Sequence, residues 1–383
     1  MAGFECASHR PRHGRRLDLT AATGHQQWAL TDYRRAREQG FLTVRDGLRW
    51  HLVEPRANCY DFSSVLPMVR AAHATGVQVI WDLFHFGFPD DLDLFSAAFV
   101  DRLGRLAREF TRLLVNETGA TCYITPINEP SYLSWAAGEV AYIHPFRQGS
   151  GAALKRHLLT AYVGAIEAIR SVQPWARIVT TDPLIFLLPH SDYPERAAQA
   201  AAMQEAQFEF SDLLAQAGPD SRYLDIVGAC YYKANQWYER GEVLRNIALE
   251  LDDPKRVPLC DLLAKLFDRY KRPVFLAETS AELDDRPAWA RLVSTQVGMA
   301  LAKGVPVEGI CWYPAIDHLG WDDDRPCHHG IWGSCDVGGA RPTSWSVVQA
   351  LRDGCPTADT SSLGDLRVRG QLEMRRLVPN APR

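Results

Sequence analysis

The chain has 383 residues, of which 46% are hydrophobic, and it carries a formal net charge of −4. A chain of this size can bury a large core, and the absence of a basic block argues against nucleic acid or an anionic membrane as a partner. No stretch approaches the ~18 apolar residues of a membrane span, and the N-terminal segment lacks a signal-peptide pattern. We therefore expect a cytoplasmic protein.

Cysteine and arginine usage support this expectation. The nine cysteines are an odd number and lie scattered in apolar segments, for example Cys122, Cys230 and Cys311. This pattern is typical of reduced thiols in a core rather than of a disulfide framework. Arginine far outnumbers lysine, which we interpret as the composition of a GC-rich bacterial genome and not as a functional signal.

Short apolar runs alternate along the chain with longer amphipathic segments. The predicted strands are 3–8, 42–50, 77–84, 121–128, 176–181, 224–232, 273–278 and 307–313. The predicted helices are 30–39, 63–75, 96–115, 152–172, 196–216, 254–270, 287–303 and 343–352. Eight strands that are each followed by a helix predict a single (β/α)8 TIM barrel of the α/β class. No Gly-x-Gly-x-x-Gly follows the first strand, which disfavours a dinucleotide-binding fold.

Local signals give some of the predicted boundaries. Ser63 is a candidate N-cap for the helix at 63–75. Residues 96–115 carry apolar side chains at a 3.6-residue spacing, which predicts an amphipathic helix. Residues 354–383 contain turn residues and charges without periodicity. We therefore expect a barrel domain over 1–353 and a C-terminal tail over 354–383 that wraps the surface or is disordered.

Two glutamates stand at the ends of predicted strands. Glu129 follows the apolar run at 121–128, and Glu278 ends the run at 273–278. The carboxyl ends of barrel strands form the mouth in which active sites lie, so we expect both side chains in one pocket. The polar and aromatic residues at or near the other strand ends are Arg45, Trp50, His85, Asn128, Tyr232 and Trp312.

Two carboxyl groups in one pocket suit the cleavage of a glycosidic bond. One group protonates the leaving oxygen, and the other attacks or stabilises the oxocarbenium-like carbon. Like charges held close together also separate their pKa values, which keeps one carboxyl protonated near neutral pH. Arg45 could hold the nucleophile ionised, and Tyr232 could donate a hydrogen bond to it. The candidate flat faces for sugar rings are Trp50, Trp135, Trp312 and Trp321.

Five segments in order make this pattern more specific. They are "LFHFGFP", "YITPINEP", "DIVGACYY", "PVFLAETS" and "WYPAIDHLGW". Together they resemble the family 1 glycoside hydrolases, the β-glucosidase and β-galactosidase group of barrel enzymes, from about residue 40 to 335. The resemblance implies that Glu129 is the general acid/base and Glu278 the nucleophile. It also implies that Tyr232 touches the nucleophile and that His85 binds the sugar.

Several positions that bind the sugar in that family are occupied by other residues in this sequence. The strand-1 glutamine aligns near Glu5, which we retain as a candidate sugar contact. The strand-8 glutamate aligns with Gly320, and the flanking His318 and Trp321 become candidate contacts instead. The strand-6 asparagine aligns with Cys230. The phosphate pocket of the 6-phospho enzymes is not visible. The reaction is therefore better indicated by the sequence than the substrate is.

Some of these assignments have rivals. Glu282 lies four residues after Glu278, but we favour Glu278 because it ends an apolar run whereas Glu282 lies in a polar loop. Tyr231 competes with Tyr232, since alternation along a strand sends only one of the two inward. Arg45 could also form a structural pair with Asp46 or Asp82.

Other chemistries are less well supported. The segment "RPCHHGIWGSC" holds Cys327, His328, His329 and Cys335, but their spacing matches no common zinc pattern. We expect no metal site there and place the histidines at the rim of the sugar cleft. A Ser-His-Asp hydrolase is disfavoured because no Gly-x-Ser-x-Gly elbow occurs.

The sequence therefore predicts a retaining β-glycosidase that needs no metal or organic cofactor. Glu278 would attack the anomeric carbon, Glu129 would act as acid and then base, and Asn128 would bind the 2-hydroxyl of the sugar. The expected partner is a small-molecule or oligosaccharide β-glycoside. Two alternatives stay open: a transglycosidase or trimming enzyme for a glycosylated metabolite or polysaccharide precursor, and a catalytically silent carbohydrate-binding barrel.

Overall fold

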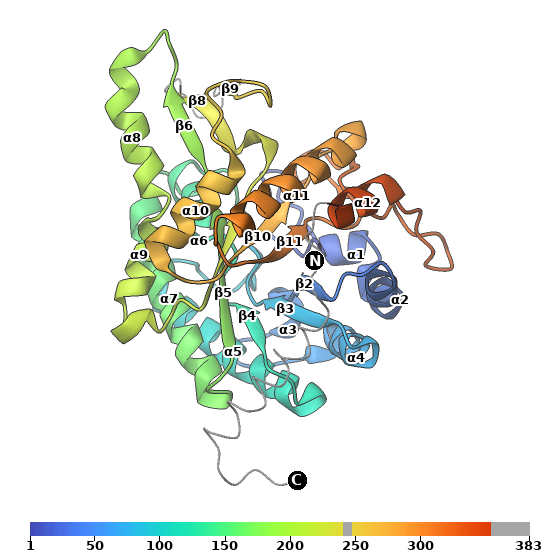
Figure 1. The fold of residues 1–383 in the computed structure, drawn as a ribbon. Coiled ribbons are helices and arrows are strands. Elements are labelled where there is room, and N and C mark those ends of the chain that lie inside the picture. The colour runs from blue at the N-terminus through green and yellow to red at the C-terminus, as the bar shows by residue number, and fades with distance from the viewer. Residues whose placement is uncertain (240–246, 354–383) are drawn as a thin grey trace.

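The structure, a computed structural model, describes residues 1–239 and 247–353. Eight parallel strands form a closed barrel, and most of them are labelled in Figure 1. The barrel closes where β1 pairs with both β2 and β11. The barrel strands are β1 (Ala2–Gly3), β2 (Thr43–Gly47), β3 (Gln78–Asp82), β4 (Tyr123–Thr125), β5 (Arg177–Pro183), β7 (Ile226–Cys230), β10 (Val274–Thr279) and β11 (Val307–Trp312). The predicted TIM barrel is therefore confirmed.

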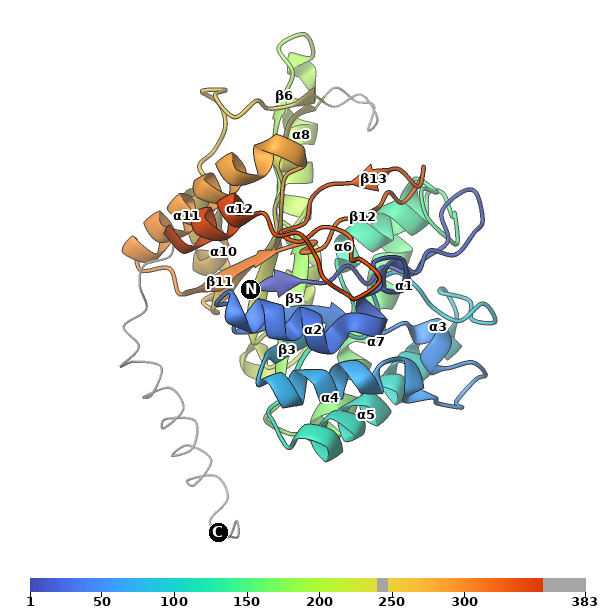
Figure 2. The ribbon, with the colours of Figure 1, turned by 90° about the vertical axis from the view of Figure 1, so that its right-hand side faces the viewer.

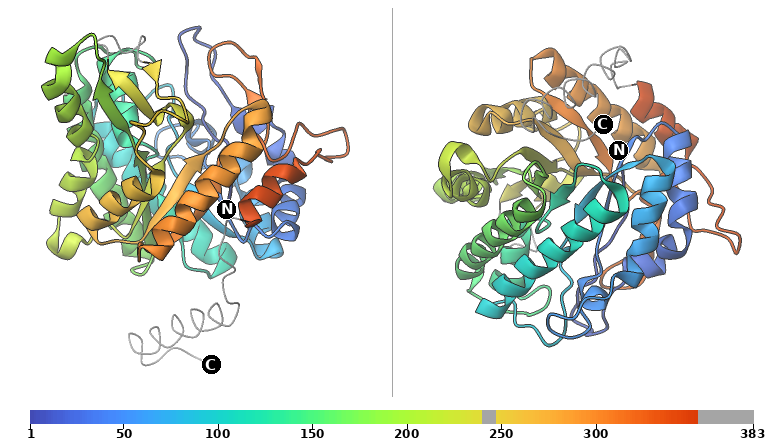
Figure 3. Two further views of the ribbon diagram at one scale, coloured as in Figure 1. Left: turned by 45° about the horizontal axis from the view of Figure 1, so that its top comes forward. Right: turned by 90° about the horizontal axis from the view of Figure 1, so that it is seen from below.

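Helices surround this barrel as an outer ring, which the view from below shows most clearly (Figure 3). Neighbouring helices pack in pairs, and α2 lies beside α4 while α11 lies beside α12 (Figure 2). The helices are α1 (Leu19–Ala22), α2 (His25–Glu38), α3 (Trp50–Val53), α4 (Leu66–Thr75), α5 (Ala97–Thr118), α6 (Pro130–Leu133), α7 (Gly151–Val172), α8 (Ala197–Ala206), α9 (Glu209–Gln216), α10 (Leu259–Tyr270), α11 (Arg286–Ala302) and α12 (Trp345–Asp353).

The helix α5 shows how the sequence determines these elements. The side chain of Ser96 accepts a hydrogen bond from the backbone N–H of Phe99 and caps the N-terminus. Gly119 ends the helix with a φ of 63°, a left-handed conformation that glycine adopts at little cost. The buried face of the helix includes Phe99, Leu103 and Phe110, as the predicted apolar spacing requires.

The hydrophobic core has an outer part, between the barrel and the helices, and a smaller part inside the barrel. The strand β10 contributes alternately to the two parts. Val274 and Leu276 belong to the outer part, whereas Phe275 and Ala277 belong to the inner one. The other buried members of the inner cluster are Ile80, Val179, Cys230, Cys311 and Tyr313.

Several predicted boundaries were wrong for local reasons. The first strand ends at Gly3, so the residues after it belong to the barrel mouth. The side chain of Asp61, not Ser63, caps the short 3-10 turn before α4. The predicted helix at 196–216 is divided into α8 and α9. The second strand ends at Gly47, which leaves Trp50 at the start of α3.

Two small sheets outside the barrel were not predicted. One contains β6 (Phe186–Pro189), β8 (Gln236–Glu239) and β9 (Ile247–Ala248), and it lies next to α8 (Figure 1). The other is an antiparallel ribbon of β12 (His318–Leu319) and β13 (Pro326–Cys327). Each strand has only two to four residues, which is too short for a periodic signal. Both sheets contribute to cavity walls described below.

Other predictions concern the thiols, the membrane and the tail. Cys122, Cys230 and Cys311 are buried and free, as predicted. No helix within residues 1–239 and 247–353 is long and apolar enough to span a membrane. The predicted tail at 354–383 lies outside the described residues.

Candidate active site

The two glutamates singled out in the sequence lie together at the barrel mouth. Glu129 follows β4 and precedes Pro130, the first residue of α6, while Glu278 is the penultimate residue of β10. One carboxylate oxygen of each, together with the sulfur of Cys230, lies within 4.8 Å of the others. Glu278 is 5% exposed, and Glu129 is partly buried. The two carboxyl groups are therefore close enough to act on one bond.

Glu278 is held by two donors from different strands. Arg45 on β2 donates from Nη1 to Oε1 over 2.6 Å, and the Tyr232 hydroxyl, just after β7, donates to Oε2 over 2.9 Å. These two charge-assisted hydrogen bonds fix the orientation of the Glu278 carboxyl group. The rival residues lie elsewhere. Glu282 forms an exposed ion pair with Arg325, and the Tyr231 hydroxyl points away from Glu278, towards Gln236 and Arg256.

Arg45 also forms the structural pair that the sequence offered as an alternative. Its Nε and Nη2 donate to the two carboxylate oxygens of Asp82 over 3.1 and 2.7 Å, while Asp46 bonds to His25 and Tyr33 instead. Burial would raise the pKa of Asp82, but the Arg45 guanidinium and His85 together outweigh burial, and the pKa is lowered. Arg45 is thus a buried cation shared by two carboxylates.

Glu129 has the opposite environment. Burial, then the negative charge of Glu278 and of Asp182, raises the pKa of Glu129 well above its usual value. Asp182 lies on β5, where its carboxylate accepts hydrogen bonds from the backbone and the hydroxyl of Ser131. Burial raises the pKa of Asp182 itself to about 7. The raised pKa therefore favours the protonated form of Glu129, whereas Glu278 accepts hydrogen bonds from Arg45 and Tyr232.

His85 and Asn128 extend the polar floor of the site. The Asn128 amide nitrogen lies 3.0 Å from His85 Nε2, and its oxygen accepts hydrogen bonds from Arg45 and from Thr181. His85 Nδ1 lies 3.1 Å from Asp82 Oδ2, so a proton on Nδ1 leaves Nε2 as the acceptor for Asn128. This chain of contacts fixes the orientation of both side chains.

Glu5 and Tyr313 complete the floor. The Glu5 carboxylate accepts hydrogen bonds from the backbone of Ala7 and from the Tyr313 hydroxyl, and it lies 3.9 Å from His85 Nε2. A Cβ atom at position 3 would lie 2.1 Å from the Tyr313 ring, so Gly3 is required for the tyrosine to lie across the barrel.

A cavity of about 620 Å³ opens above this floor. The floor residues Glu5, His85, Asn128, Glu129, Tyr232 and Glu278 line it, and so do the polar residues Ser131, Gln207 and Asn235. Its upper wall is mainly apolar and aromatic, with Phe86, Tyr132, Trp135, Ile185, Met203, Trp237 and Trp321. The extra sheet and α8 supply Trp237 and Met203 to this wall. Such a cavity combines a polar floor with an apolar entrance.

The four tryptophans that were predicted to stack on sugar rings lie in two different environments. Trp135 and Trp321 line the cavity. Trp50 and Trp312 are fully buried and do not line it, so their prediction as sugar platforms was wrong. Trp50 was placed on a strand but lies on α3, packed against Phe84 and donating to Glu54. The indole N–H of Trp312 instead donates to the backbone oxygen of His329.

A second cavity, of about 380 Å³, adjoins the first and shares Glu5, Tyr232 and Trp321 as lining residues. It is also lined by His318 and His329. His318 therefore lies at the rim and does not line the cavity above Glu129 and Glu278.

Sequence reasoning missed several residues of the site. Asp182 ends a strand in "TTDP", so the strand-end rule that selected Glu129 could also have selected it. Tyr313 follows the last strand and was overlooked beside Trp312. Cys6, whose sulfur lies 3.2 Å from His85 Nδ1, carried no signal, because a small thiol beside an apolar run is typical of a core.

Three groups of side chains in the described ranges could bring metal ligands together. Two of them, Cys6–Asp82–His85 and Glu129–Cys230–Glu278, belong to the site just described. Their members already bond to each other or to Arg45 and Tyr232. The third group consists of His318, Cys327 and His329 at the rim.

The fold is a closed TIM barrel with two neighbouring glutamates at its mouth. No family model matches the sequence, and no curated protein matches it. Solved structures of family 1 β-glucosidases do match it. The chain is similar to the β-glucosidase from Thermotoga maritima in complex with azafagomine, with a TM-score of 0.74 and 16% identity, over 93% of this chain and 94% of that one.

Two further solved structures agree. The chain is similar to the family 1 β-glucosidase from Thermotoga maritima in complex with isofagomine lactam, with a TM-score of 0.71 and 15% identity, over 87% of this chain and 88% of that one. It is also similar to the β-glycosidase BGL167, with a TM-score of 0.69 and 18% identity over 88% of both chains. At these identities the match establishes the fold of the family 1 β-glucosidases.

Proposed function

We propose that this protein hydrolyses a β-glycoside with retention of anomeric configuration. The observation that supports this most directly is the asymmetry of the two neighbouring carboxyl groups. Glu278 accepts hydrogen bonds from Arg45 and Tyr232, whereas burial and the charge of Glu278 raise the pKa of Glu129. A retaining glycosidase needs this pair, with one carboxylate as nucleophile and one carboxylic acid as proton donor, about 5–5.5 Å apart.

In the first step the Glu278 carboxylate attacks the anomeric carbon, and the bond to the leaving oxygen breaks as Glu129 protonates that oxygen. Arg45 and Tyr232 keep the nucleophile ionised and oriented. The Asn128 amide nitrogen, fixed by contacts to its oxygen from Arg45 and Thr181, is available to donate to the 2-hydroxyl. A bond that strengthens at this position as charge develops accelerates the reaction.

In the second step Glu129, now a carboxylate, takes a proton from water, and the resulting nucleophile displaces the sugar from Glu278. Glu129 leaves this step protonated and Glu278 leaves it ionised, which restores the starting state. The chemistry requires only these side chains and water. His85 and Glu5, on the floor of the cavity, are positioned to contact hydroxyls of the bound sugar.

The substrate class follows from the cavity and from the similar proteins. The solved Thermotoga maritima β-glucosidase is described in complexes with deoxynojirimycin and noeuromycin, so a glucoside is the first substrate to test. The apolar upper wall favours an aglycone with a hydrophobic face over a purely polysaccharide leaving group. The same wall favours an alcohol acceptor in place of water, which keeps transglycosylation as a second candidate.

The experiment is intact-mass spectrometry after incubation with activated 2-deoxy-2-fluoro-β-glycosides. The proposal expects a mass increase of one fluorosugar in the wild type and in Glu282→Ala, and none in Glu278→Ala. Added alcohol, with analysis of the products, separates hydrolysis from transfer. An adduct that persists in Glu278→Ala would overturn the assignment of the nucleophile. If none of the 2-deoxy-2-fluoro-β-glycosides forms an adduct, and aryl β-glycosides of the same sugars are not cleaved, the result would favour the silent carbohydrate-binding barrel.

A further inference from the structure

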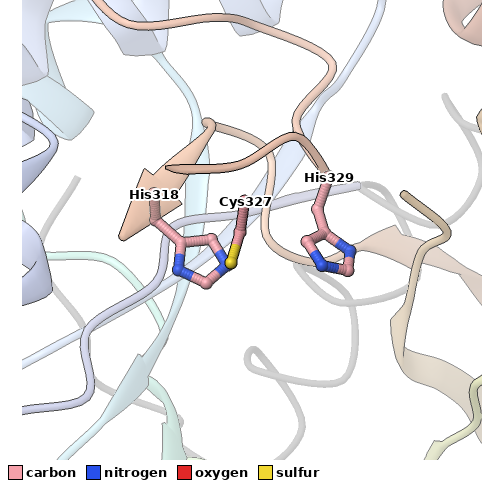
Figure 4. Close-up of side chains that lie close together, drawn as sticks. All are labelled: His318, Cys327 and His329. Carbon is pink, nitrogen blue, oxygen red and sulfur yellow. The ribbon is translucent and has the colours of Figure 1, made fainter. Parts of the chain in front are cut away.

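A cluster of two imidazoles and one thiol lies outside the catalytic machinery, at the rim of the barrel mouth. His318 and Cys327 are directly paired residues of the β12–β13 ribbon, and His329 follows two positions later. One donor atom from each side chain lies within 4.8 Å of the other two. The three side chains leave the same loop region and point to the same side of it (Figure 4).

The residues of this cluster differ from the four that the sequence offered as a zinc pattern. Of the four residues in that reading, His328 turns away to bond to Asp317 over 2.8 Å, and the Cys335 sulfur lies near the backbone oxygen of Thr23. The ribbon supplies His318 instead, from nine positions before Cys327 along the chain. Because the pairing of two very short strands creates the group, no local spacing pattern could have revealed it.

We propose that His318, Cys327 and His329 bind one divalent transition-metal ion of the zinc type, with a fourth position open to the adjoining cavity. A thiolate with two imidazoles is a donor set that suits zinc and not magnesium or calcium, which prefer oxygen. Three protein ligands with an open position are the arrangement of zinc sites that bind water or substrate. None of the three side chains takes part in the chemical steps proposed above, so the metal site does not depend on that proposal.

The surroundings of the ligands support this assignment. His318 Nδ1 lies 2.7 Å from the backbone oxygen of Leu319. A carbonyl only accepts hydrogen bonds, so Nδ1 carries the proton and Nε2 keeps its lone pair for a metal. His329 Nδ1 lies 3.3 Å from the Ser280 hydroxyl. A contact of one ring nitrogen with a protein group is the usual means of orienting a metal-binding imidazole.

The geometry requires only a small adjustment. Zinc bonds of about 2.0–2.3 Å in a tetrahedron place the donor atoms roughly 3.3–3.6 Å apart, so donors that lie within 4.8 Å need to close by roughly 1.5 Å at most. His318 and His329 are partly exposed, and their ring planes are inclined by 26° with centroids 5.7 Å apart. Small movements of these rings and of the Cys327 side chain, within their present rotamers, can supply this closure. Metal binding would release the thiol proton of Cys327.

The open position would face the cavity of about 380 Å³ that also contains Tyr232 and Trp321. The nearest carboxylate to His329 is Glu282, whose oxygen lies 3.9 Å from Nε2 and which is paired with Arg325. A bound ion would join the two strands of the ribbon and fix one wall of the substrate entrance. The open coordination position of the ion could also bind a hydroxyl group of the glycoside substrate.

The test uses the full chain, freed of metal by a chelator and kept reduced with a non-thiol reductant. Titration with Co²⁺ is expected to give one equivalent of bound ion, with visible bands of tetrahedral cobalt and a near-ultraviolet cobalt–thiolate band. Addition of Zn²⁺ should abolish these bands, and binding should release one proton. The proposal is overturned if no stoichiometric thiolate band develops, in which case the histidines serve only as a polar rim.

Variants assign the ligands. Cys327→Ser is expected to lose the thiolate band, and His318→Ala is expected to weaken Co²⁺ binding at least tenfold, with circular dichroism to verify the fold. The matched controls are His328→Ala, whose imidazole bonds to Asp317, and Cys59→Ser, which removes an exposed thiol. Both should bind as the wild type does. A band that survives in Cys327→Ser would overturn the assignment. Glu278→Ala should bind Co²⁺ normally, so this test and that of the proposed function can fail separately.

Discussion

Arg45 and Glu278 form a buried ion pair at the centre of the site, with 2.6 Å between Nη1 and Oε1, and both side chains are almost entirely excluded from solvent. The same guanidinium binds Asp82 through two nitrogens. One cation therefore compensates two carboxylates inside the barrel, and its removal should affect both folding and catalysis.

Arg45→Met should destabilise the protein by about 3–5 kcal/mol, because it leaves two buried carboxylates without a counter-charge. Urea unfolding measures this free energy. The matched control is Arg70→Ala, which breaks an exposed pair with Glu117 and should cost about 0–1 kcal/mol. Equal effects of the two substitutions would contradict the role assigned to Arg45.

Glu129→Gln should remove the alkaline limb of the pH profile of kcat/KM. The raised pKa keeps Glu129 protonated at pH values where an ordinary glutamate is ionised, so wild-type activity should fall as the pH rises through that pKa. The variant should lose about 10²–10⁴-fold in rate on glycosides with poor leaving groups. It should lose far less on activated aryl glycosides, which need no protonation. An alkaline limb that persists in the variant would assign it to another group.

Asp182→Asn should shift that alkaline limb to lower pH. The negative charge of Asp182 helps to raise the pKa of Glu129, so its loss lets Glu129 ionise earlier. Burial raises the pKa of Asp182 to about 7, and the shift should therefore be largest where Asp182 is ionised, above that value. The asparagine can keep both contacts with Ser131, so the local structure should be preserved. If the alkaline limb of the pH profile does not move in Asp182→Asn, Asp182 does not influence the pKa of Glu129.

Tyr232→Phe should lower kcat by roughly 10–100-fold, since a hydrogen bond to a charged group contributes about 1.5–3 kcal/mol. The neighbouring Tyr231→Phe is the matched control, because its hydroxyl bonds to Gln236 and Arg256 and not to Glu278. This control should reduce stability while leaving kcat unchanged. A similar loss of kcat in both variants would show that Tyr232 acts through the fold.

The two tryptophan environments predict different effects. Trp321→Ala should raise KM for aryl glycosides, since its side chain lines the cavity. Trp50→Phe should leave KM unchanged and lower the free energy of unfolding by about 1–3 kcal/mol, through lost packing and an unpaired Glu54 oxygen. Steady-state kinetics together with urea unfolding distinguish the two outcomes.

The sequence was informative wherever a strand was long enough to carry a pattern. The barrel, and the positions of Glu129 and Glu278, follow from apolar runs whose carboxyl ends meet at one mouth. Arg45 was assigned two competing partners, and the structure shows that it binds both Glu278 and Asp82. A guanidinium has five N–H donors, so Arg45 can bind a catalytic carboxylate and a structural one at the same time.

The sequence was uninformative where contacts join distant short segments. The cluster at the rim depends on the pairing of His318 with Cys327 in strands of two residues. Trp50 was misplaced because the end of β2 carries no local signal, and the chain turns into α3 before reaching it. The apolar upper wall was missed because β6 and β8 form a sheet outside the barrel.

The backbone of Glu129 has a φ of 43°, in the left-handed region that residues with a side chain rarely adopt. Such a conformation costs on the order of 1–3 kcal/mol. Glycine adopts this conformation without strain. Substitution by glycine would also remove a partly buried carboxyl group. Glu129→Gly could therefore yield a protein that is inactive but more resistant to unfolding. A library selected for heat resistance alone would tend to discard the proposed acid, Glu129, so selection for thermostability should be combined with an assay of turnover.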